Sequence, residues 1–352
     1  LDMCLACKGC KIECPSSVDM AKLKYEVLGH YHKEHGYSLR DRLFAKVYKL
    51  NPIGNRLAPV LNLAMKLPGR GMAQSLIGIH PKRTMPKFAT QTFSSWFKKH
   101  QLDVFREAGA RGRVLLFNDT FMEGNHPEVG IATTRILEKL GFSVETAPRW
   151  CCGRTMMSKG MMDLVKENAQ NNVDLFYPYA QAGIPIIGTE PSCLLTLRDE
   201  YPDLLPGDSK ASMVASQAFL LDEFLAELAK DADLDLNLQP HDGKVIFHGH
   251  CHQKAIAGVD ASVAALKLVP GVQVETPDTG CCGMAGAFGF EKEHYDVSMT
   301  IGERVLFPAV RNNPDAVIVT TGVSCHQQVE DGTGVKTMHL AEFLAQQLGG
   351  VA

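Results

Sequence analysis

The sequence lacks several features that mark common protein classes. It has no apolar run of about 18 residues, so no transmembrane helix is predicted. Its 36 Lys and Arg against 39 Asp and Glu give a formal net charge of −3. A chain without an overall basic excess is not expected to bind nucleic acid. What remains is a globular protein, whose 352 residues are enough for two or three domains.

Cysteine, in contrast, is abundant. The chain has 11 cysteines, and they are not spread as in a small secreted domain held by disulfides. They form tight groups and adjacent pairs, which indicates metal ligation in a reducing compartment. The first group is Cys4, Cys7, Cys10 and Cys14, and the other seven are Cys151, Cys152, Cys193, Cys251, Cys281, Cys282 and Cys325.

The first group has the spacing C-x2-C-x2-C-x3-C-P and ends at Pro15. Three thiolates on such a short loop can hold three corners of a cubane cluster, while backbone N–H groups donate to the cluster sulfurs. We therefore interpret Cys4–Cys14 as a 4Fe-4S site. The alternative is a zinc knuckle, but zinc sites more often pair two distant C-x2–4-C units.

The role of Cys14 stays open. In two-cluster ferredoxins the fourth cysteine of this motif ligates the other cluster, and this sequence has no second run of the same spacing. Either Cys14 completes this cluster or a second motif lies upstream of Leu1. We expect the second, because the sequence opens with Leu1 just before the motif, an unusual place for a natural start.

Helical patterns come first, and strands begin near residue 111. Residues 21–49 have helical spacing, Asn51-Pro52 interrupts it, and a second apolar helix follows at about 55–66. Residues 72–110 read as a linker with short helices. Beyond it, short apolar strands alternate with helices, which predicts parallel sheets. The predicted strands are Arg113–Asn118, Phe142–Ala147, Ile184–Gly188, Gly243–Phe247 and Ala316–Thr320.

This α/β part is duplicated. Cys281-Cys282-Gly283 repeats Cys151-Cys152-Gly153 after 130 residues, and Val323-Ser324-Cys325 repeats Pro191-Ser192-Cys193 after 132. Matched anchors at nearly one offset indicate an internal duplication. The predicted fold class is thus α/β, with two parallel-sheet repeats behind a small α-helical ferredoxin-like segment. The predicted domains are residues 1–30 (part of a ferredoxin-like segment), 31–110 (helical linker), 111–230 (repeat 1) and 241–352 (repeat 2).

In each repeat the cysteines follow predicted strands. Ligand sites gather beyond the carboxyl ends of parallel strands, so we expect the seven cysteines to meet at one sheet edge or at the seam between repeats. Buried cysteines acting as small apolar residues, a zinc site and a vicinal disulfide are the alternatives. Three further candidates are His248, His250 and His252, which are expected on one face of the strand end, opposite Cys251, as ligands, proton carriers or satisfied polar residues. His326 is another candidate ligand. Arg154 and Lys254 either offset the charge of thiolates or a cluster, or are simply solvated.

These features resemble a known architecture of iron–sulfur proteins, the CCG domain. The resemblance rests on CLACKGCKIECP, WCCGR, EPSC, HGHCHQKA and GCCGMAGAFGF. Similar units occur in subunits of glycolate oxidase, anaerobic glycerol-3-phosphate dehydrogenase and heterodisulfide reductase. The sequence most resembles the carboxy-terminal part of large FAD-linked oxidases of the D-2-hydroxyglutarate and D-lactate dehydrogenase type.

This resemblance implies an oxidoreductase. FAD, in an upstream domain or a separate flavoprotein subunit, would oxidise a D-2-hydroxyacid, and electrons would pass through the cluster at Cys4–Cys14 to the CCG region or an external acceptor. The alternative is a stand-alone CCG subunit of a glycolate oxidase, glycerol-3-phosphate dehydrogenase or heterodisulfide reductase type complex. It further implies a cytoplasmic protein, with peripheral membrane association as a second reading.

The sequence departs from the heterodisulfide reductase pattern. Both repeats end in one cysteine instead of C-x-x-C, and the first has Asp119-Thr120-Phe121 where the second has His250-Cys251-His252. We therefore place a single metal or cluster site in the second repeat, with thiol–disulfide chemistry at Cys281-Cys282 as the alternative. The apolar helix Asn55–Leu67 is interpreted as packing in a core or against another domain, in preference to lying on a membrane. The ligands of the second-repeat site would be Cys251, Cys281, Cys282 and Cys325.

Overall fold

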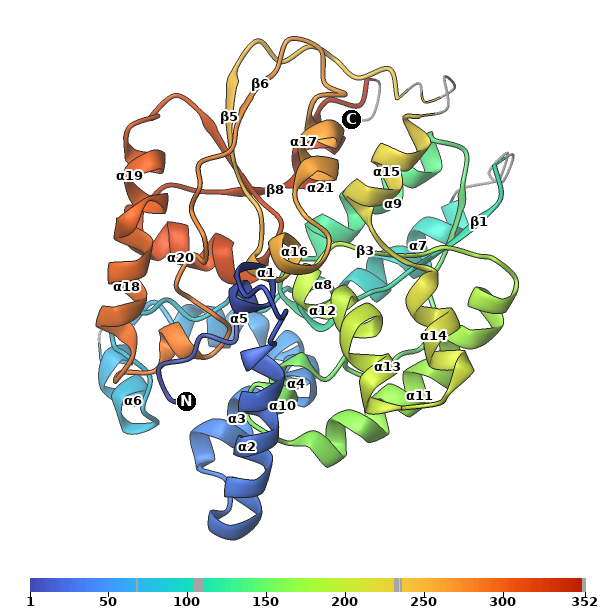
Figure 1. The fold of residues 1–352 in the computed structure, drawn as a ribbon. Helices are drawn as coiled ribbons and strands as arrows, with labels where there is room; N and C mark the ends of the chain where they lie inside the picture. Colours follow the sequence, from blue (N-terminus) through green and yellow to red (C-terminus); the bar gives the residue numbers. More distant parts are fainter. Residues whose placement is uncertain (68, 104–110, 231–233, 235, 350–352) are drawn as a thin grey trace.

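The computed structural model describes residues 1–67, 69–103, 111–230, 234 and 236–349. Two four-stranded sheets with the same strand order form the body of the protein, and a helical N-terminal segment packs against both (Figure 1). The predicted fold class is confirmed, because the duplication seen in the sequence appears as two copies of one sheet topology. The domain boundaries stay a prediction.

The first repeat has the strand order β2-β1-β3-β4, and all of its pairings are parallel. Apart from the exposed Arg113 at the start of one of them, its central strands are apolar and buried, as expected where helices cover both faces of a sheet. The strands are β1 (Arg113–Leu116), β2 (Ser143–Glu145), β3 (Ile186–Gly188) and β4 (Ala218–Leu220). The helices are α8 (Thr120–Gly124), α9 (Pro127–Lys139), α10 (Arg154–Met157), α11 (Met162–Gln181), α12 (Pro191–Leu195), a π-helix (Thr196–Glu200), α13 (Tyr201–Leu204), α14 (Ser209–Ser216) and α15 (Leu221–Leu228).

The second repeat has the matching order β6-β5-β7-β8, again parallel throughout. Its predicted strands at 243–247 and 316–320 are present within one residue of the expected bounds. The strands are β5 (Lys244–His248), β6 (Gln273–Glu275), β7 (Val317–Thr320) and β8 (Met338–His339). The helices are α16 (Cys251–Ile256), α17 (Asp260–Leu266), a 3-10 helix (Phe288–Phe290), α18 (Tyr295–Arg304), α19 (Leu306–Arg311), α20 (Val323–Thr333) and α21 (Leu340–Gln346).

The N-terminal segment differs from its prediction in two places. Residues 21–49 form three helices, since Gly36, with φ +75°, ends the first of them. Pro52, expected to interrupt a helix, lies inside α4, where the cost is one backbone hydrogen bond. Asn51 and Asn55 hold α4 in place by donating to the carbonyls of Thr120 and Gly124. The helices are α1 (Gly9–Glu13), α2 (Met20–His35), α3 (Leu39–Ala45), α4 (Val47–Arg56), α5 (Ala58–Ala64), α6 (Arg70–Leu76) and α7 (Phe93–Asp103).

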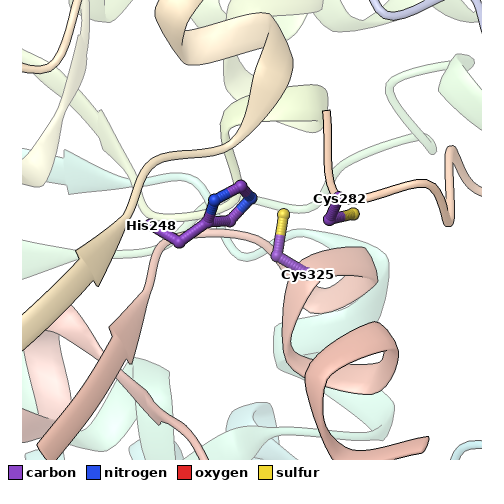
Figure 2. Close-up of side chains that lie close together, drawn as sticks. All are labelled: His248, Cys282 and Cys325. Carbon is purple, nitrogen blue, oxygen red and sulfur yellow. The ribbon is translucent and has the colours of Figure 1, made fainter. Parts of the chain in front are cut away.

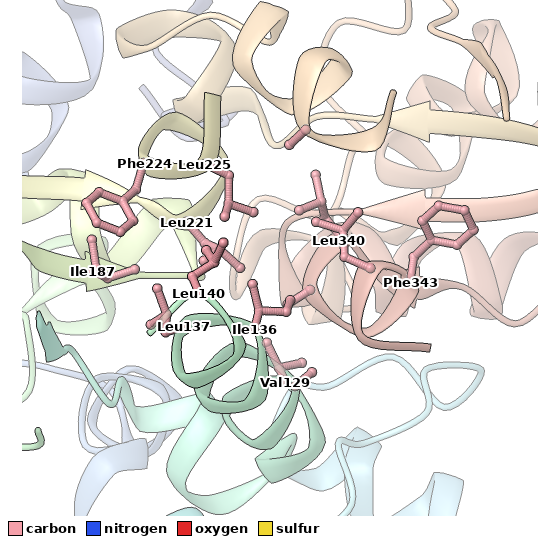
Figure 3. Close-up of a cluster of buried hydrophobic side chains, with 14 of the residues drawn as sticks. Val129, Ile136, Leu137, Leu140, Ile187, Leu221, Phe224, Leu225, Leu340 and Phe343 are labelled. Carbon is pink, nitrogen blue, oxygen red and sulfur yellow. The ribbon is translucent and has the colours of Figure 1, made fainter. Parts of the chain in front are cut away.

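One apolar core joins the two repeats. Helices α9 and α15 of the first repeat meet α17 and α21 of the second along what we call the seam. Figure 3 shows Ile136 of α9 next to Leu340 of α21, while Leu137 of α9 lies closer to Leu140 and to Leu221 of α15. Because these side chains are almost fully buried, the two sheets are fixed relative to one another, and so are the residues at their carboxyl ends.

The outer face of α4–α6 is apolar and exposed. Leu57, Val60, Leu63 and Leu67 are 51–67% exposed, so these side chains do not belong to the core of this chain, and packing of Asn55–Leu67 against another domain stays a prediction. The surrounding chain is also cationic, because residues 42–102 contain 11 Lys and Arg and no Asp or Glu. An exposed apolar face with a positive rim is typical of a surface that contacts another molecule or a lipid headgroup layer.

Candidate metal centre

In the second repeat, three segments that follow strands converge. β5 ends at His248 and α16 begins at Cys251, while α20 follows β7 and carries Cys325 in its first turn. The loop after β6 brings Cys281 and Cys282 to the same place. This is the arrangement expected at the carboxyl edge of a parallel sheet, where the turn from strand to helix leaves room for a ligand.

His248, Cys282 and Cys325 form the tightest group. One ligand atom from each lies within 4.8 Å of the others, all three side chains are buried, and Figure 2 shows the imidazole turned toward the two sulfurs. Nδ1 of His248 is hydrogen-bonded to Thr279 Oγ1 at 2.6 Å, while the buried Nε2 has no partner. When Nδ1–H donates to Thr279, Nε2 keeps its lone pair for a metal.

The electrostatics of the site keep His248 neutral. Burial, followed by the nearby charge of Lys254, lowers the pKa of His248 well below its usual value. Lys254 itself donates to Thr279 Oγ1 at 2.9 Å and to the Gly280 carbonyl at 3.0 Å, so it is engaged and not merely solvated. A neutral imidazole is the form that binds metal ions.

The remaining thiols of the second repeat extend this group. Cys281 is hydrogen-bonded to Cys251, and Cys282 to both Cys281 and Cys325. Hydrogen bonding to Cys281, and then burial, raises the pKa of Cys251 well above that of a free thiol. Without metal the Cys251 thiol is therefore protonated, and a bound metal would displace its proton. The structure brings together all four cysteines that the sequence assigned to this repeat.

The first repeat has a poorer set of donors. Cys151, Cys152 and Cys193 are all buried. Cys152 contacts both Cys151 and Cys193, and Thr120 lies beside Cys151. Among the residues that the structure describes, no group of three ligand atoms in this repeat is as close as the group at His248. The seven cysteines thus form two groups, one on each side of the seam, instead of the single cluster that was one of the expectations.

A carboxylate separates the two groups. Glu190 is 5% exposed and accepts hydrogen bonds from Ser192 N–H and from Val323 N–H, 2.8 Å away in the other repeat. Burial, and then the charge of Glu190, raises the pKa of Asp119 to about 6. Cys193 therefore lies near two buried acids, a setting that opposes thiolate formation.

The loop of Cys4–Cys14 packs against the second repeat. Ala6 N–H donates to Cys4 Sγ and Met20 N–H to Cys10 Sγ, both at 3.4 Å, which is the backbone-to-sulfur pattern of iron–sulfur sites. Cys7 is hydrogen-bonded to Cys281, and this contact followed by burial raises the pKa of Cys7. The loop motif thus touches the second-repeat cysteines directly.

Cys14 lies apart from these contacts. Its thiol accepts hydrogen bonds from the N–H groups of Val18 and Ser16, which lower the pKa of Cys14. The four loop thiols do not meet the close spacing of the His248 group, but cubane ligands bind different iron atoms and stand further apart than ligands of one ion. That Cys14 ligates a second cluster, with its other ligands upstream of Leu1, stays a prediction.

The histidines around Cys251 do not share one face, contrary to expectation. His250 precedes α16 and its Nδ1 accepts from His252 N–H, whereas Nε2 of His252 is hydrogen-bonded to the Ala6 carbonyl at 2.8 Å. The chain turns from strand to helix at His250, so the alternation of a strand no longer applies. His326 is hydrogen-bonded to Thr337 and lies near His126.

The lysine within the cysteine motif was not predicted as a functional residue. The Lys8 side chain is 0% exposed and contacts three carboxylates, and Arg154 is buried and paired with Glu200 at 2.7 Å. Burial alone would lower the pKa of Lys8, but the attraction of Glu200 and the other carboxylates holds it above its usual value. No sequence signal distinguishes such a lysine from a solvated one.

The donors present fit an iron–sulfur group. Soft thiolates select iron–sulfur clusters and zinc over hard cations, and both cysteine sites consist of thiols with at most one imidazole. The buried, unpartnered Nε2 of His248 is a vacant donor that a metal would satisfy. Cys4, Cys7 and Cys10 would hold one group, and Cys251, Cys281, Cys282 and Cys325 with His248 the other.

Comparison with known proteins gives one family and several relatives. The family model described as a CCG cysteine-rich domain matches residues 117–198 and 245–330, one match in each repeat. One subunit of anaerobic glycerol-3-phosphate dehydrogenase from Escherichia coli K12 is 30% identical over 88% of this chain and 78% of its own length. No described helix is long and apolar enough to cross a membrane.

Two further relatives differ in how much of them the chain matches. D-2-hydroxyglutarate dehydrogenase from Escherichia coli K12 is 30% identical over 95% of this chain, which spans only 33% of that protein. Lactate utilization protein A from Macrococcus caseolyticus is 29% identical over 68% of this chain and 98% of its own length. The chain therefore resembles a separate subunit, a smaller whole protein and one part of a larger dehydrogenase.

Proposed function

The chain belongs to the CCG cysteine-rich domain family, and from this premise we propose that it is the iron–sulfur electron-transfer part of an FAD-linked dehydrogenase. The observation that carries the proposal is the contact between the two cysteine sites. Cys7 of the N-terminal loop lines the same pocket as Cys251 and Cys281 of the second repeat. Two metal groups held by these residues would be adjacent, as a path for single electrons requires.

The chain's own residues would hold and shield these groups. Cys4, Cys7 and Cys10, and Cys14 if it closes the same cluster, would bind a 4Fe-4S cluster, which supplies reversible one-electron chemistry when bound. His248, Cys282 and Cys325 are buried, so water is largely excluded from them, whereas Cys251 and Cys281 are partly exposed. Thr279 orients His248, and the covering loop is held by Lys254.

We propose a D-2-hydroxyacid as the substrate of the complete enzyme, with FAD in an upstream domain of the same protein. The resemblance to D-2-hydroxyglutarate dehydrogenase supports this arrangement, because the chain matches one third of that relative. A stand-alone protein that works with a separate flavoprotein is supported equally well, because the chain covers most of the related glycerol-3-phosphate dehydrogenase subunit.

Anaerobic reconstitution tests the proposal. The purified chain, incubated with ferrous iron, sulfide and a thiol reductant, is expected to gain bound iron and sulfide and the broad visible absorbance of thiolate-ligated iron. Dithionite should bleach that absorbance and air should restore it. A colourless protein that binds zinc stoichiometrically and no iron would contradict the proposal and support a structural zinc protein instead.

We also propose that the exposed face of α4–α6 contacts an anionic membrane surface. The face is apolar, and the residues around it carry positive charge without any acidic residue between positions 42 and 102. Interfacial binding of this kind combines buried apolar area with attraction to anionic lipid.

Vesicle sedimentation tests this contact. The chain should pellet with vesicles that contain phosphatidylglycerol, should stay in solution with phosphatidylcholine alone, and should lose binding on Val60→Glu. Leu164→Glu, which changes a 39% exposed leucine elsewhere, is the matched control. Equal pelleting of Val60→Glu and the unmodified chain would contradict this use of the α4–α6 face.

A further inference from the structure

The lysine inside the cysteine motif is buried among acids from two parts of the chain. Lys8 Nζ lies 2.8 Å from Asp19, 2.7 Å from Asp199 and 2.9 Å from Glu200, and none of its side chain is exposed. Asp19 precedes α2, whereas the other two acids belong to the first repeat. A lysine buried to this extent occurs in proteins almost only when it is paired.

The first repeat supplies its acids from an unusual element. Residues Thr196–Glu200 form a π-helix, a widened turn that is rare and often found at functional sites. It presents Asp199 and Glu200 toward Lys8, and Glu200 is held on its other side by Arg154 at 2.7 Å. Arg154 directly follows the Cys151-Cys152-Gly153 motif. The segment that follows the paired cysteines of the first repeat therefore anchors the N-terminal loop.

Weaker contacts hold the loop from other sides. Nε2 of His252 is hydrogen-bonded to the Ala6 carbonyl at 2.8 Å, and Lys24 donates to the Cys4 carbonyl at 2.6 Å. Each of these binds one backbone oxygen, whereas Lys8 binds three carboxylates. Lys8 is also the neighbour of Cys7 in the chain, so the place of the Lys8 ammonium determines where the Cys7 thiol lies.

We propose that Lys8 is a positioning residue, which locks the cysteine loop onto Asp199 and Glu200 of the first repeat and thereby holds Cys7 against Cys281 of the second. In this arrangement the first repeat fixes the distance between the cysteine loop and the second-repeat cysteines. The inference deepens the proposed function, on which the role of the two sites rests, but the geometry it concerns exists in the metal-free chain.

Disulfide trapping measures this geometry without metal. The metal-free chain is treated briefly with diamide, which takes two electrons and two protons from a pair of thiols as their S–S bond forms. Remaining thiols are alkylated, and the peptide that joins Cys7 to Cys281 is quantified by mass spectrometry. The unmodified chain should form this bond readily, and Lys8→Met should form it at least tenfold more slowly.

Arg198→Met is the matched control, because Arg198 belongs to the same π-helix but pairs with Glu223 at 2.8 Å, away from the loop. It should trap Cys7 with Cys281 as fast as the unmodified chain. Equal trapping in Lys8→Met would overturn the proposal, and so would slowing of the same size in Arg198→Met. Failure of the unmodified chain to trap this pair would overturn the contact itself.

Lys8→Met takes one cation from three acids, of which Asp199 still pairs with Lys11 and Glu200 with Arg154, so it needs a companion that keeps the fold. Asp199→Asn retains the shape of one partner and two of the three carboxylates, and it should slow trapping by a smaller factor. Circular dichroism tests whether each variant is folded. If Lys8→Met does not fold, Asp199→Asn takes its place, and an unchanged trapping rate in that folded variant overturns the proposal. Iron binding is scored separately, so a chain that traps Cys7 normally yet binds no iron contradicts only the proposed function.

Discussion

The two repeats share a strand order but end their strands in different chemistry. The pairing register aligns β1 with β5, and it places Phe117 where the second repeat has His248 and Thr120 where it has Cys251. Phe117 is buried against Phe176, in a purely apolar contact. Two candidate ligands of the second repeat thus have no counterpart in the first, although the backbone framework is the same.

The two copies of a duplicated fold can therefore take different roles. The second repeat keeps the imidazole and four thiols that a metal group needs. The first keeps three thiols next to buried acids, and its paired-cysteine motif leads into Arg154, which supports the carboxylate that holds Lys8. Under the proposed function the second repeat would hold a metal group, and the first repeat would hold the N-terminal loop beside it.

The largest expected effect comes from removing one thiol in each repeat. Cys325→Ser should abolish metal binding at the second-repeat site, because Cys325 lies in the group of ligand atoms within 4.8 Å. Cys193→Ser, the corresponding change in the first repeat, should leave the metal content unchanged. Iron analysis after anaerobic reconstitution compares them, and equal losses in the two variants would remove the distinction between the repeats.

The distinction can also be tested by converting one repeat into the other. Phe117→His with Thr120→Cys gives the first repeat the two donors that it lacks. The double variant should bind about one additional cobalt ion with the absorbance of thiolate ligation, as expected for a four-ligand site. Without any additional binding, ligand identity would not be what separates the repeats, and the buried acids near Cys193 would become the better explanation.

A smaller effect is expected from the residue that orients His248. Thr279→Val removes the hydrogen bond to Nδ1 while keeping the size of the side chain. Loss of such a partner should weaken metal binding by roughly 10–100-fold. Thr300→Val removes a threonine hydrogen bond on the exposed side of α18 and serves as the control. Competition with a chelator measures the affinity, and equal affinities in both variants would count against His248 as a ligand.

The smallest effect concerns the seam. Burial lowers the pKa of His339 to about 4, from its usual 6.5. The folded state therefore binds this proton less readily than the unfolded state, and stability is lost as the pH falls from about 6.5 through 4. The loss should be about 2 kcal/mol, less than the full pKa difference implies because the side chain keeps some contact with water.

His339→Asn should remove this part of the pH dependence. Asparagine is a favourable residue before a helix, so the start of α21 should be preserved. Urea unfolding at pH 7 and at pH 4.5 measures the difference between the two free energies of unfolding. If the variant and the unmodified chain lose the same stability over this range, His339 is not the group responsible.

The cysteine sites and the duplication could be predicted from the sequence because short, local motifs carry both. The motif around Cys4–Cys14 and the paired cysteines predicted the loop, the two sheets and the grouping within the second repeat. The position of Pro52 inside a helix could not be predicted, because α4 is held by contacts of Asn51 and Asn55 with residues about 70 positions away. Such tertiary contacts leave no mark in the local pattern.

Charge and exposure were the least predictable features. Lys8 lies between two cysteines and reads as a solvated lysine, yet its partners Asp199 and Glu200 are almost 200 residues distant in the chain. Leu57 and Val60 were expected in a core or against another domain, and in this chain they face outward. In both cases the outcome depends on which elements pack together, which composition alone does not determine.

Electron paramagnetic resonance of the reconstituted, stepwise-reduced chain tests most directly whether the loop and the second repeat each hold a metal group. We expect two iron–sulfur signals, one lost on Cys10→Ser in the loop and the other lost on Cys282→Ser in the second repeat, with both retained in Cys152→Ser. A single signal that all three variants remove, or a second-repeat signal that survives Cys282→Ser and disappears in Cys152→Ser, would contradict this division between the repeats.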